Sequence, residues 1–171
     1  MFQAHLDVNV SAEKLWRVAG EQFGQVGQYA SGLSSSHLEG PLEVGGTRVC
    51  MIGKTKMVET LLSYDAEERT LSYRLVHGGP QAMMKKAENH WAITSLGPHR
   101  SRLTLTPTVE FKWWAFPMGL LFKLEIRSVF QTFFDELKHY AETGMVHPRK
   151  LQRDAKEGRV NPLMEAPALA E

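Results

Sequence analysis

The clearest chemical signal in the sequence is a tight turn with an arginine and a glutamate on either side of it. Gly53-Lys54, with glycine first, fits the type II′ turn of a two-residue β-hairpin. In the resulting register Arg48 faces Glu59 across two antiparallel strands. In an apolar cavity such a pair can orient a polar group of a ligand or take part in acid–base chemistry. Elsewhere it would be a structural cross-strand ion pair worth a few tenths of a kcal/mol to about 1 kcal/mol.

The same register predicts which side chains share a face with this ion pair. Residues two apart in a strand point to the same side of the sheet. The shared face is predicted to hold Arg48, Cys50, Met57, Glu59 and Leu61. The prediction depends on the register, because a slip of one residue would move every one of these side chains to the other face.

No other cluster of residues indicates catalysis or a metal site. The seven histidines are scattered, without the His-Glu-x-x-His or similar spacing that holds zinc. A single cysteine, Cys50, excludes an intrachain disulfide and a zinc site built from paired thiolates. The sequence contains neither a nucleophile elbow nor a phosphate-binding glycine loop. We therefore expect no metal and no cofactor, and no residue can be assigned as catalytic.

Length and composition predict one globular domain in the cytoplasm. The 171 residues, 43% hydrophobic and 23% charged, are enough to bury a sizeable core. The net charge of +1 and the lack of a basic stripe argue against nucleic-acid binding. No run of about 20 apolar residues could span a membrane, and the N-terminus does not read as a signal peptide.

Hydrophobic periodicity predicts an α+β domain with one antiparallel sheet and one long helix. An alternating strand at 2–8 precedes two short helices, at 12–19 and near 26–29. Six further strands are expected at about 34–39, 47–52, 56–64, 70–76, 87–96 and 102–111. The turns between them are short, so these strands pair antiparallel. The apolar stripe over 117–143 predicts the long helix, which Gly144 suits as a C-terminal cap.

The composition of the chain changes after Gly144. Residues 1–144 contain every predicted element and are expected to form the domain. Residues 145–171 are rich in charge, proline and alanine, and contain little that could bury a core. We therefore expect an extended or disordered C-terminal tail.

Three motifs, taken with the order of the elements, are similar to a known family. Val10-Ser-Ala-Glu-Lys-Leu-Trp16 resembles its start of the first helix, and Gly45-Gly-Thr-Arg-Val49 resembles the start of one of its strands. Val58-Glu-Thr-Leu-Leu-Ser-Tyr-Asp65 with Arg69-Thr-Leu-Ser-Tyr73 resembles one of its hairpins. The family is the START-like helix-grip superfamily (SRPBCC), in its bacterial polyketide cyclase/dehydrase-like branch, over roughly 2–143. The resemblance implies a curved seven-stranded antiparallel sheet wrapped around the long C-terminal helix.

The resemblance also implies a cavity that binds a small, largely hydrophobic ligand, for transport or sensing. The glutamate that matches Glu59 lines the pocket of related receptors, so the face with Arg48 would line it here. One alternative is a polyketide cyclase or dehydratase, with Glu59 as base and Arg48 stabilising an enolate. Another is a lipid or quinone carrier at membranes. The hormone-receptor function of abscisic acid receptors is not implied, because 52–55 is a tight turn without a gate loop and 32–36 lacks their lysine.

Side chains of other elements are expected to complete the cavity. The strand at 70–76 would supply Tyr73, whose hydroxyl would bond either a ligand or a wall residue, and Leu75. On the next strand either His90 or Trp91 would point inward. The predicted ligand-binding residues are Arg48, Cys50, Met57, Glu59, Leu61, Tyr73, Leu75, Phe122, Ile126, Val129, Phe130 and Phe133. The helical members of this set would equally suit a plain core.

Four aromatic residues stand together in Phe111-Lys-Trp-Trp-Ala-Phe-Pro117, between the last strand and the long helix. They could close the floor of the cavity as part of the core, or form a subunit contact. They could also reach a bilayer, with Trp113 and Trp114 at the interface beside Lys112 and Lys123. The sequence leaves these three alternatives open, together with the oligomeric state and the identity of the ligand.

Overall fold

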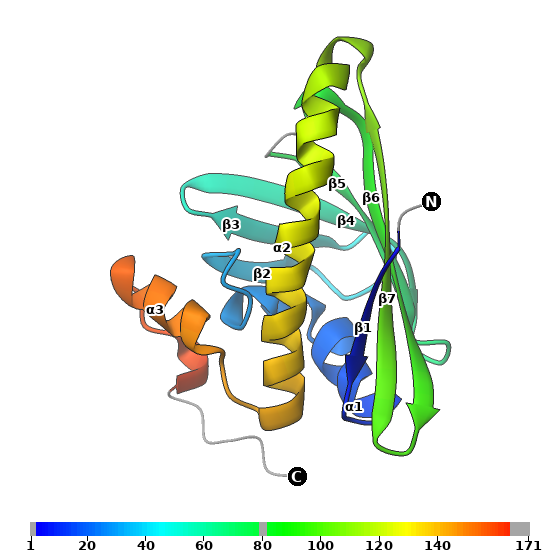
Figure 1. Cartoon of the computed structure of the whole chain (residues 1–171), viewed down its shortest axis with the longest axis vertical. Helices are drawn as coiled ribbons and strands as arrows, with labels where there is room; N and C mark the ends of the chain where they lie inside the picture. Colours follow the sequence, from blue (N-terminus) through cyan, green and yellow to red (C-terminus); the bar gives the residue numbers. More distant parts are fainter. Residues whose placement is uncertain (1–2, 79–81, 165–171) are drawn as a thin grey trace.

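Alternating and apolar segments form seven strands, joined by short turns into one antiparallel sheet (Figure 1). The computed structural model describes residues 3–78 and 82–164, without the side chains of 116–126 and of Met164. The strands are β1 (Ala4–Val8), β2 (Ser35–Glu39), β3 (Thr47–Ile52), β4 (Thr55–Asp65), β5 (Thr70–His77), β6 (Met84–Gly97) and β7 (Arg100–Phe111). Their order in the sheet is β1-β7-β6-β5-β4-β3-β2, so sequential strands are neighbours and only β1 pairs with a strand far along the chain.

The hairpin between β3 and β4 has the predicted register. Ile52 pairs with Thr55 and Arg48 pairs with Glu59. Gly53 has a φ of 57°, in the region that favours glycine, whereas Lys54 does not have a positive φ. This combination is the one that a type II′ turn requires, and it fixes the register of the two strands.

The segment between β1 and β2 is less regular than the two predicted helices. Ser11 caps α1 (Ala12–Trp16) by accepting a hydrogen bond from the Lys14 backbone N–H, and a π-helical turn then replaces the rest of the predicted helix. The second predicted helix is a 3₁₀ segment, Phe23–Gln28. A Cβ at Gly27 would lie 2.5 Å from the backbone of β2, so glycine lets this segment pack directly on the strand.

The long helix α2 (Phe116–Thr143) runs across the sheet, which curves around it (Figure 1). It ends at Gly144, whose φ of 72° is left-handed and whose N–H donates to the Tyr140 carbonyl. Lys138 on α2 donates to the Asp7 carbonyl of β1, which joins the helix to the edge of the sheet. Large apolar residues that are almost fully buried in the resulting core include Val8, Leu15, Phe23, Leu61, Leu71, Leu103, Leu105 and Leu137. Among the described residues, no helix is both long and apolar enough to cross a membrane.

The prediction of an extended or disordered tail is wrong for part of it, because a further helix, α3 (Pro148–Lys156), follows α2. Pro148 stands in its first turn, and the His147 ring caps it by accepting from the Arg149 N–H. Figure 1 shows α3 beside the C-terminal part of α2. Composition misled the prediction because it treats charged residues as solvated, whereas Lys150 and Asp154 are buried against the domain.

Candidate functional site

A cavity of about 380 Å³ lies between the sheet and α2. Strands β3 to β7 form one side of it, and α2, α3 and the chain from the 3₁₀ helix to Leu33 form the other sides. Two exposed apolar side chains on its wall, Ile52 and Val129, are 40% and 59% exposed, so the cavity reaches solvent beside them. Its volume is in the range of pockets that hold small organic molecules.

Most of the residues predicted to bind a ligand come together in this cavity. The lining includes Arg48, Cys50, Met57, Glu59, Tyr73, Val129, Phe130 and Phe133. The side chains of Phe122 and Ile126 lie outside the described part of the structure.

Leu61 and Leu75 were expected on the cavity wall, and the structure places both elsewhere. Leu61 is 1% exposed and packs in the core. Leu75 lines a separate hollow of about 190 Å³, at the point where β5 and β6 separate beyond the Arg74–Glu88 pair. Leu61 keeps the predicted face, but the core packs over it. Leu75 lies outside the cavity because β5 leaves β6 after Arg74.

A buried ion pair forms the polar part of the wall. Arg48 donates from Nε and Nη2 to the same oxygen of Glu59, Oε2, at 2.7 and 2.6 Å. Its Nη1 donates to the Phe23 carbonyl at 3.0 Å, and the guanidinium carbon lies 3.6 Å from the centre of the Phe23 ring. The Tyr73 ring lies 5.0 Å from the same carbon. Arg48 is 4% and Glu59 is 7% exposed, so this is not a solvated cross-strand pair.

Burial and this ion pair set the protonation states on the wall. Burial lowers the pKa of Arg48, but the Glu59 carboxylate more than offsets that effect, so the guanidinium stays charged. Burial raises the pKa of the Cys50 thiol to about 12. Burial, with the Glu59 charge, also raises the pKa of Tyr73 to about 12. At neutral pH the part of the wall formed by β3, β4 and β5 therefore presents one balanced ion pair, a neutral thiol and a neutral phenol.

Cys50 is expected to be unreactive toward thiol reagents in the folded protein. It is 1% exposed, and its pKa of about 12 leaves almost no thiolate at pH 8. With dithionitrobenzoate at pH 8, labelling should be complete in guanidinium chloride and negligible in buffer over the same time. Rapid labelling of the folded chain would contradict the buried position of the thiol.

Two polar residues of the wall were not predicted from the sequence. Asn89 was missed, and Trp91 was one of two alternatives for the inward residue of β6. Both line the cavity, whereas His90 between them is exposed, which answers the question of which residue of β6 points inward. Asn89 donates from Nδ2 to the Tyr73 hydroxyl at 3.2 Å. The Asn89 Oδ1 and the Trp91 Nε1 are buried without a hydrogen-bond partner in the described structure. Asn89 and Trp91 are two residues apart in β6, so their side chains point to the same face of the sheet. Knowing that one of them points inward would have been enough to predict the other.

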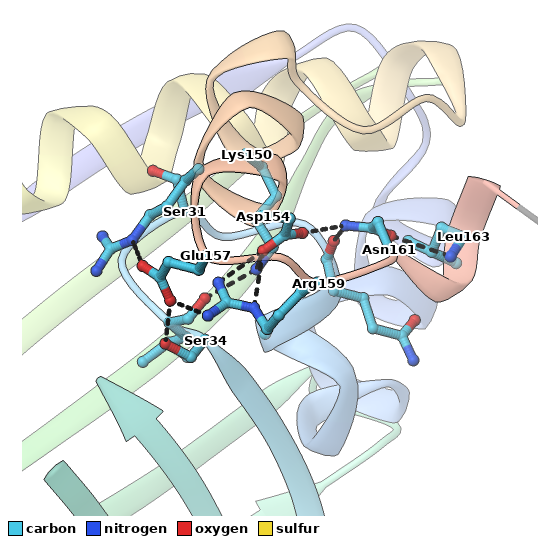
Figure 2. Close-up of polar contacts among 12 residues, drawn as sticks. Ser31, Ser34, Lys150, Asp154, Glu157, Arg159, Asn161 and Leu163 are labelled. Atoms are coloured by element: carbon cyan, nitrogen blue, oxygen red, sulfur yellow. Dashed lines mark hydrogen bonds and ion pairs between the residues drawn. The ribbon is translucent and has the colours of Figure 1, made fainter. Parts of the chain in front are cut away.

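Helix α3 forms part of the cavity rim, since its Arg153 lines the cavity together with the segment 30–33. Figure 2 shows the polar contacts that hold it there. Lys150 donates from Nζ to the Leu33 carbonyl at 2.8 Å and lies 2.9 Å from the Asp154 carboxylate. Asp154 also accepts hydrogen bonds from Arg159 and Asn161. These contacts attach residues beyond α2 to the strip of chain that borders the cavity.

The aromatic residues before α2 do not all close the floor of the cavity. Trp113 is 85% and Trp114 is 52% exposed, so the interpretation of these two as core residues is wrong. They lie in a short 3₁₀ turn, Trp113–Ala115, in which only the alanine is buried. This turn precedes α2 and lies at the far end of that helix from α3 (Figure 1).

Comparisons with solved structures find the same fold in other proteins. The crystal structure of Ara h 8.0201 superimposes with a TM-score of 0.66 at 17% identity, covering 82% of this chain and 95% of the other. Norcoclaurine synthase from Thalictrum flavum, in complex with dopamine and hydroxybenzaldehyde, has a TM-score of 0.60 at 14% identity, covering 80% and 84%. A protein of Thermus thermophilus has a TM-score of 0.65 at 16% identity, covering 81% and 94%. These likenesses confirm the predicted helix-grip α+β fold.

A family model supplies the assignment that structural likeness at this identity does not give. No curated protein matches the chain. The model described as "Polyketide cyclase / dehydrase and lipid transport" matches residues 2–142, which include every strand and almost all of α2. The chain therefore belongs to the polyketide cyclase/dehydrase and lipid transport family, within the START-like helix-grip superfamily.

Proposed function

We propose that the protein binds a small, largely hydrophobic ligand in the cavity between the sheet and α2, for transport or sensing. The observation that carries this proposal is the cavity itself, about 380 Å³ in volume and open to solvent beside Val129. Tyr73, Trp91 and Phe133 contribute aromatic surface to its wall. Burial of apolar ligand surface against such a wall supplies most of the affinity, at about 25 cal/mol per Å².

Binding is favoured over catalysis by the arrangement of the Arg48–Glu59 pair. For Arg48 to stabilise an enolate, its guanidinium would have to leave Glu59 and the Phe23 carbonyl. Arg48 Nη2 lies 2.6 Å from Glu59 Oε2, and both side chains are almost fully buried. Arg48 also donates a hydrogen bond to the Phe23 carbonyl. A cyclase or dehydratase would lose turnover but keep ligand binding in Glu59→Gln. A binding protein has no turnover to lose.

Native mass spectrometry of the full chain purified from its own host tests the proposal. We expect a retained small molecule, which solvent extraction then releases for identification. In Met57→Trp the new indole would occupy cavity space, so the retained molecule should be lost. The matched control is Met51→Trp, because Met51 neighbours Cys50 on β3 and does not line the cavity. Equal retention in both variants, or no binding of any apolar compound by the wild type, would contradict the proposal.

A carrier that works at membranes is a second candidate, which the exposure of Trp113 and Trp114 favours. Exposed tryptophans next to a lysine are typical of side chains that insert at a bilayer interface. We expect the protein to sediment with phosphatidylcholine–phosphatidylglycerol vesicles and the Trp113→Ala, Trp114→Ala double variant to remain in the supernatant. The control is Val44→Ala with Val160→Ala, which removes exposed apolar groups elsewhere. Vesicle binding that is absent, or equal in both double variants, would exclude this role.

A further inference from the structure

The two carboxylate oxygens of Glu59 are used unequally. Arg48 donates to Oε2 from both Nε and Nη2, and the Cys50 thiol lies 3.7 Å from the same oxygen. Within the described part of the chain, no hydrogen bond reaches Oε1. An ionised carboxylate accepts about four hydrogen bonds, so Glu59 has spare capacity on the wall of the cavity.

The positive charge on this wall is, by contrast, already satisfied. The Arg48 guanidinium bonds Glu59 and the Phe23 carbonyl, and its plane is covered by the Phe23 ring. A ligand carboxylate could bind Arg48 only by competing with Glu59, which would leave a buried carboxylate without its partner. A ligand ammonium would approach the same carboxylate against the Arg48 charge. The wall therefore favours a neutral hydrogen-bond donor.

The remaining charged groups on the wall do not change this balance. Glu136 accepts from the Ser31 N–H and pairs with Arg149, so its charge is compensated within the protein. Arg153 pairs with Glu157. Both belong to the end of the cavity next to α3, whereas the Arg48–Glu59 pair belongs to β3 and β4.

Aromatic rings stand beside the ion pair. The Tyr73 and Trp91 rings are 5.9 Å apart and edge-on, and the Trp91 and Phe133 rings are 5.7 Å apart. Three such rings, two on the sheet and one on α2, suit a flat ring, which can stack on one of them and meet the edge of another. Asn89 adds a second acceptor near Tyr73, since its Oδ1 has no partner in the described structure.

On the basis of the ligand-binding function proposed above, we infer that the ligand is a neutral ring compound with a hydroxyl group that donates to Glu59 Oε1. The hydroxyl would form a charge-assisted hydrogen bond, and the ring would lie among Tyr73, Trp91 and Phe133. Such a bond is about twice as strong as a neutral one. It therefore distinguishes a phenol or alcohol from the hydrocarbon of the same shape.

Four naphthalene probes separate the hydroxyl from the ring that carries it. Calorimetric titration of the full chain uses naphthalene, 2-naphthol, 2-methoxynaphthalene and 2-naphthoate in one buffer at pH 7. We expect 2-naphthol to bind about 10- to 100-fold more tightly than naphthalene, because a hydrogen bond to a charged group contributes a factor of this size to affinity. The methyl ether, which cannot donate, should bind like naphthalene, and 2-naphthoate should bind no more tightly than naphthalene.

Indole N–H signals in a ¹⁵N-labelled sample locate the bound probe. The Trp91 signal, assigned through Trp91→Phe, should shift with 2-naphthol, whereas the signal of Trp16, which is buried outside the cavity, should not. In Glu59→Gln the size of the side chain is kept and its charge is removed. The advantage of 2-naphthol over naphthalene should fall several-fold in this variant.

The probe series on the wild-type chain decides the inference even where a variant fails to fold. If 2-naphthol and its methyl ether bind with equal affinity, the inference is overturned. It is also overturned if 2-naphthoate binds most tightly. Either result would leave cavity binding itself intact. Failure of all four probes to shift the Trp91 signal would instead overturn the proposed ligand-binding function on which the inference rests.

Discussion

Replacing Glu59 with alanine is expected to lower the free energy of unfolding by about 3–5 kcal/mol. The substitution leaves the Arg48 guanidinium buried, with the Phe23 carbonyl as its remaining hydrogen-bond acceptor. A buried cation cannot recover the hydration that it lost on folding, and Arg48 cannot give up its proton to avoid the penalty. Urea denaturation of both proteins at pH 7, followed by circular dichroism, measures the difference.

Two controls separate the unpaired charge from the loss of a side chain. Glu88→Ala removes a glutamate from the same kind of cross-strand pair, but its partner Arg74 is half-exposed, so we expect a loss below about 1 kcal/mol. The double variant Arg48→Met, Glu59→Leu removes both buried charges and should be more stable than Glu59→Ala alone. A Glu59→Ala variant that loses no more than Glu88→Ala would show that solvent reaches the pair.

Local patterns were enough to predict the β3–β4 hairpin and therefore much of the site. The Gly53-Lys54 turn is a local signal, and once it is accepted the position of Arg48 opposite Glu59 follows from strand geometry. The burial of the pair did not follow from the turn. The curvature that places α2 over this face depends on all seven strands together, so a local turn cannot predict it. The burial of the pair was expected only from the family resemblance.

The parts of the site that the sequence did not reveal depend on contacts between distant segments. Leu75 leaves the cavity because the β5–β6 pairing ends at Arg74, and no residue pattern within β5 marks that point. Helix α3 was missed because Lys150 finds its acceptor, the Leu33 carbonyl, 117 residues away. Charge predicts solvation until a partner is known, and partners across such separations are set by the tertiary structure.

The second large effect is expected at α3, where Asp154→Ala should release the helix from the domain. The Lys150 side chain is 1% exposed and would keep only the Leu33 carbonyl as its acceptor. Arg159 and Asn161 would each lose one acceptor and keep Glu157 and the Gln28 carbonyl. Removing one partner of a buried ion pair destabilises the contact by about 3 kcal/mol, the lower end of the usual range. Backbone amides of α3 should then exchange with deuterium about a hundredfold faster at pH 7.

Acid should remove the difference between the two proteins. Burial raises the pKa of Asp154, but its hydrogen bonds from Lys150, Arg159 and Asn161 more than offset this, so the pKa lies below its usual range. The stabilisation by Asp154 is therefore complete above the pKa of the unfolded chain, about 4, and disappears as the pH falls through the lower pKa of the folded chain. Protection of α3 in the wild type should approach that of Asp154→Ala only below pH 4.

A matched control on the same helix is Glu157→Gln. Glu157 contacts Arg153, Arg159 and Ser34 from the solvent side, and we expect exchange of α3 to rise less than about fivefold. If the two variants behave alike, Asp154 is not the anchor of the helix. If Asp154→Ala alone releases α3, the cavity loses the part of its rim that includes Arg153, and bound naphthalene should dissociate faster. Release of α3 with unchanged dissociation would mean that ligands enter and leave on the Val129 side without passing this helix.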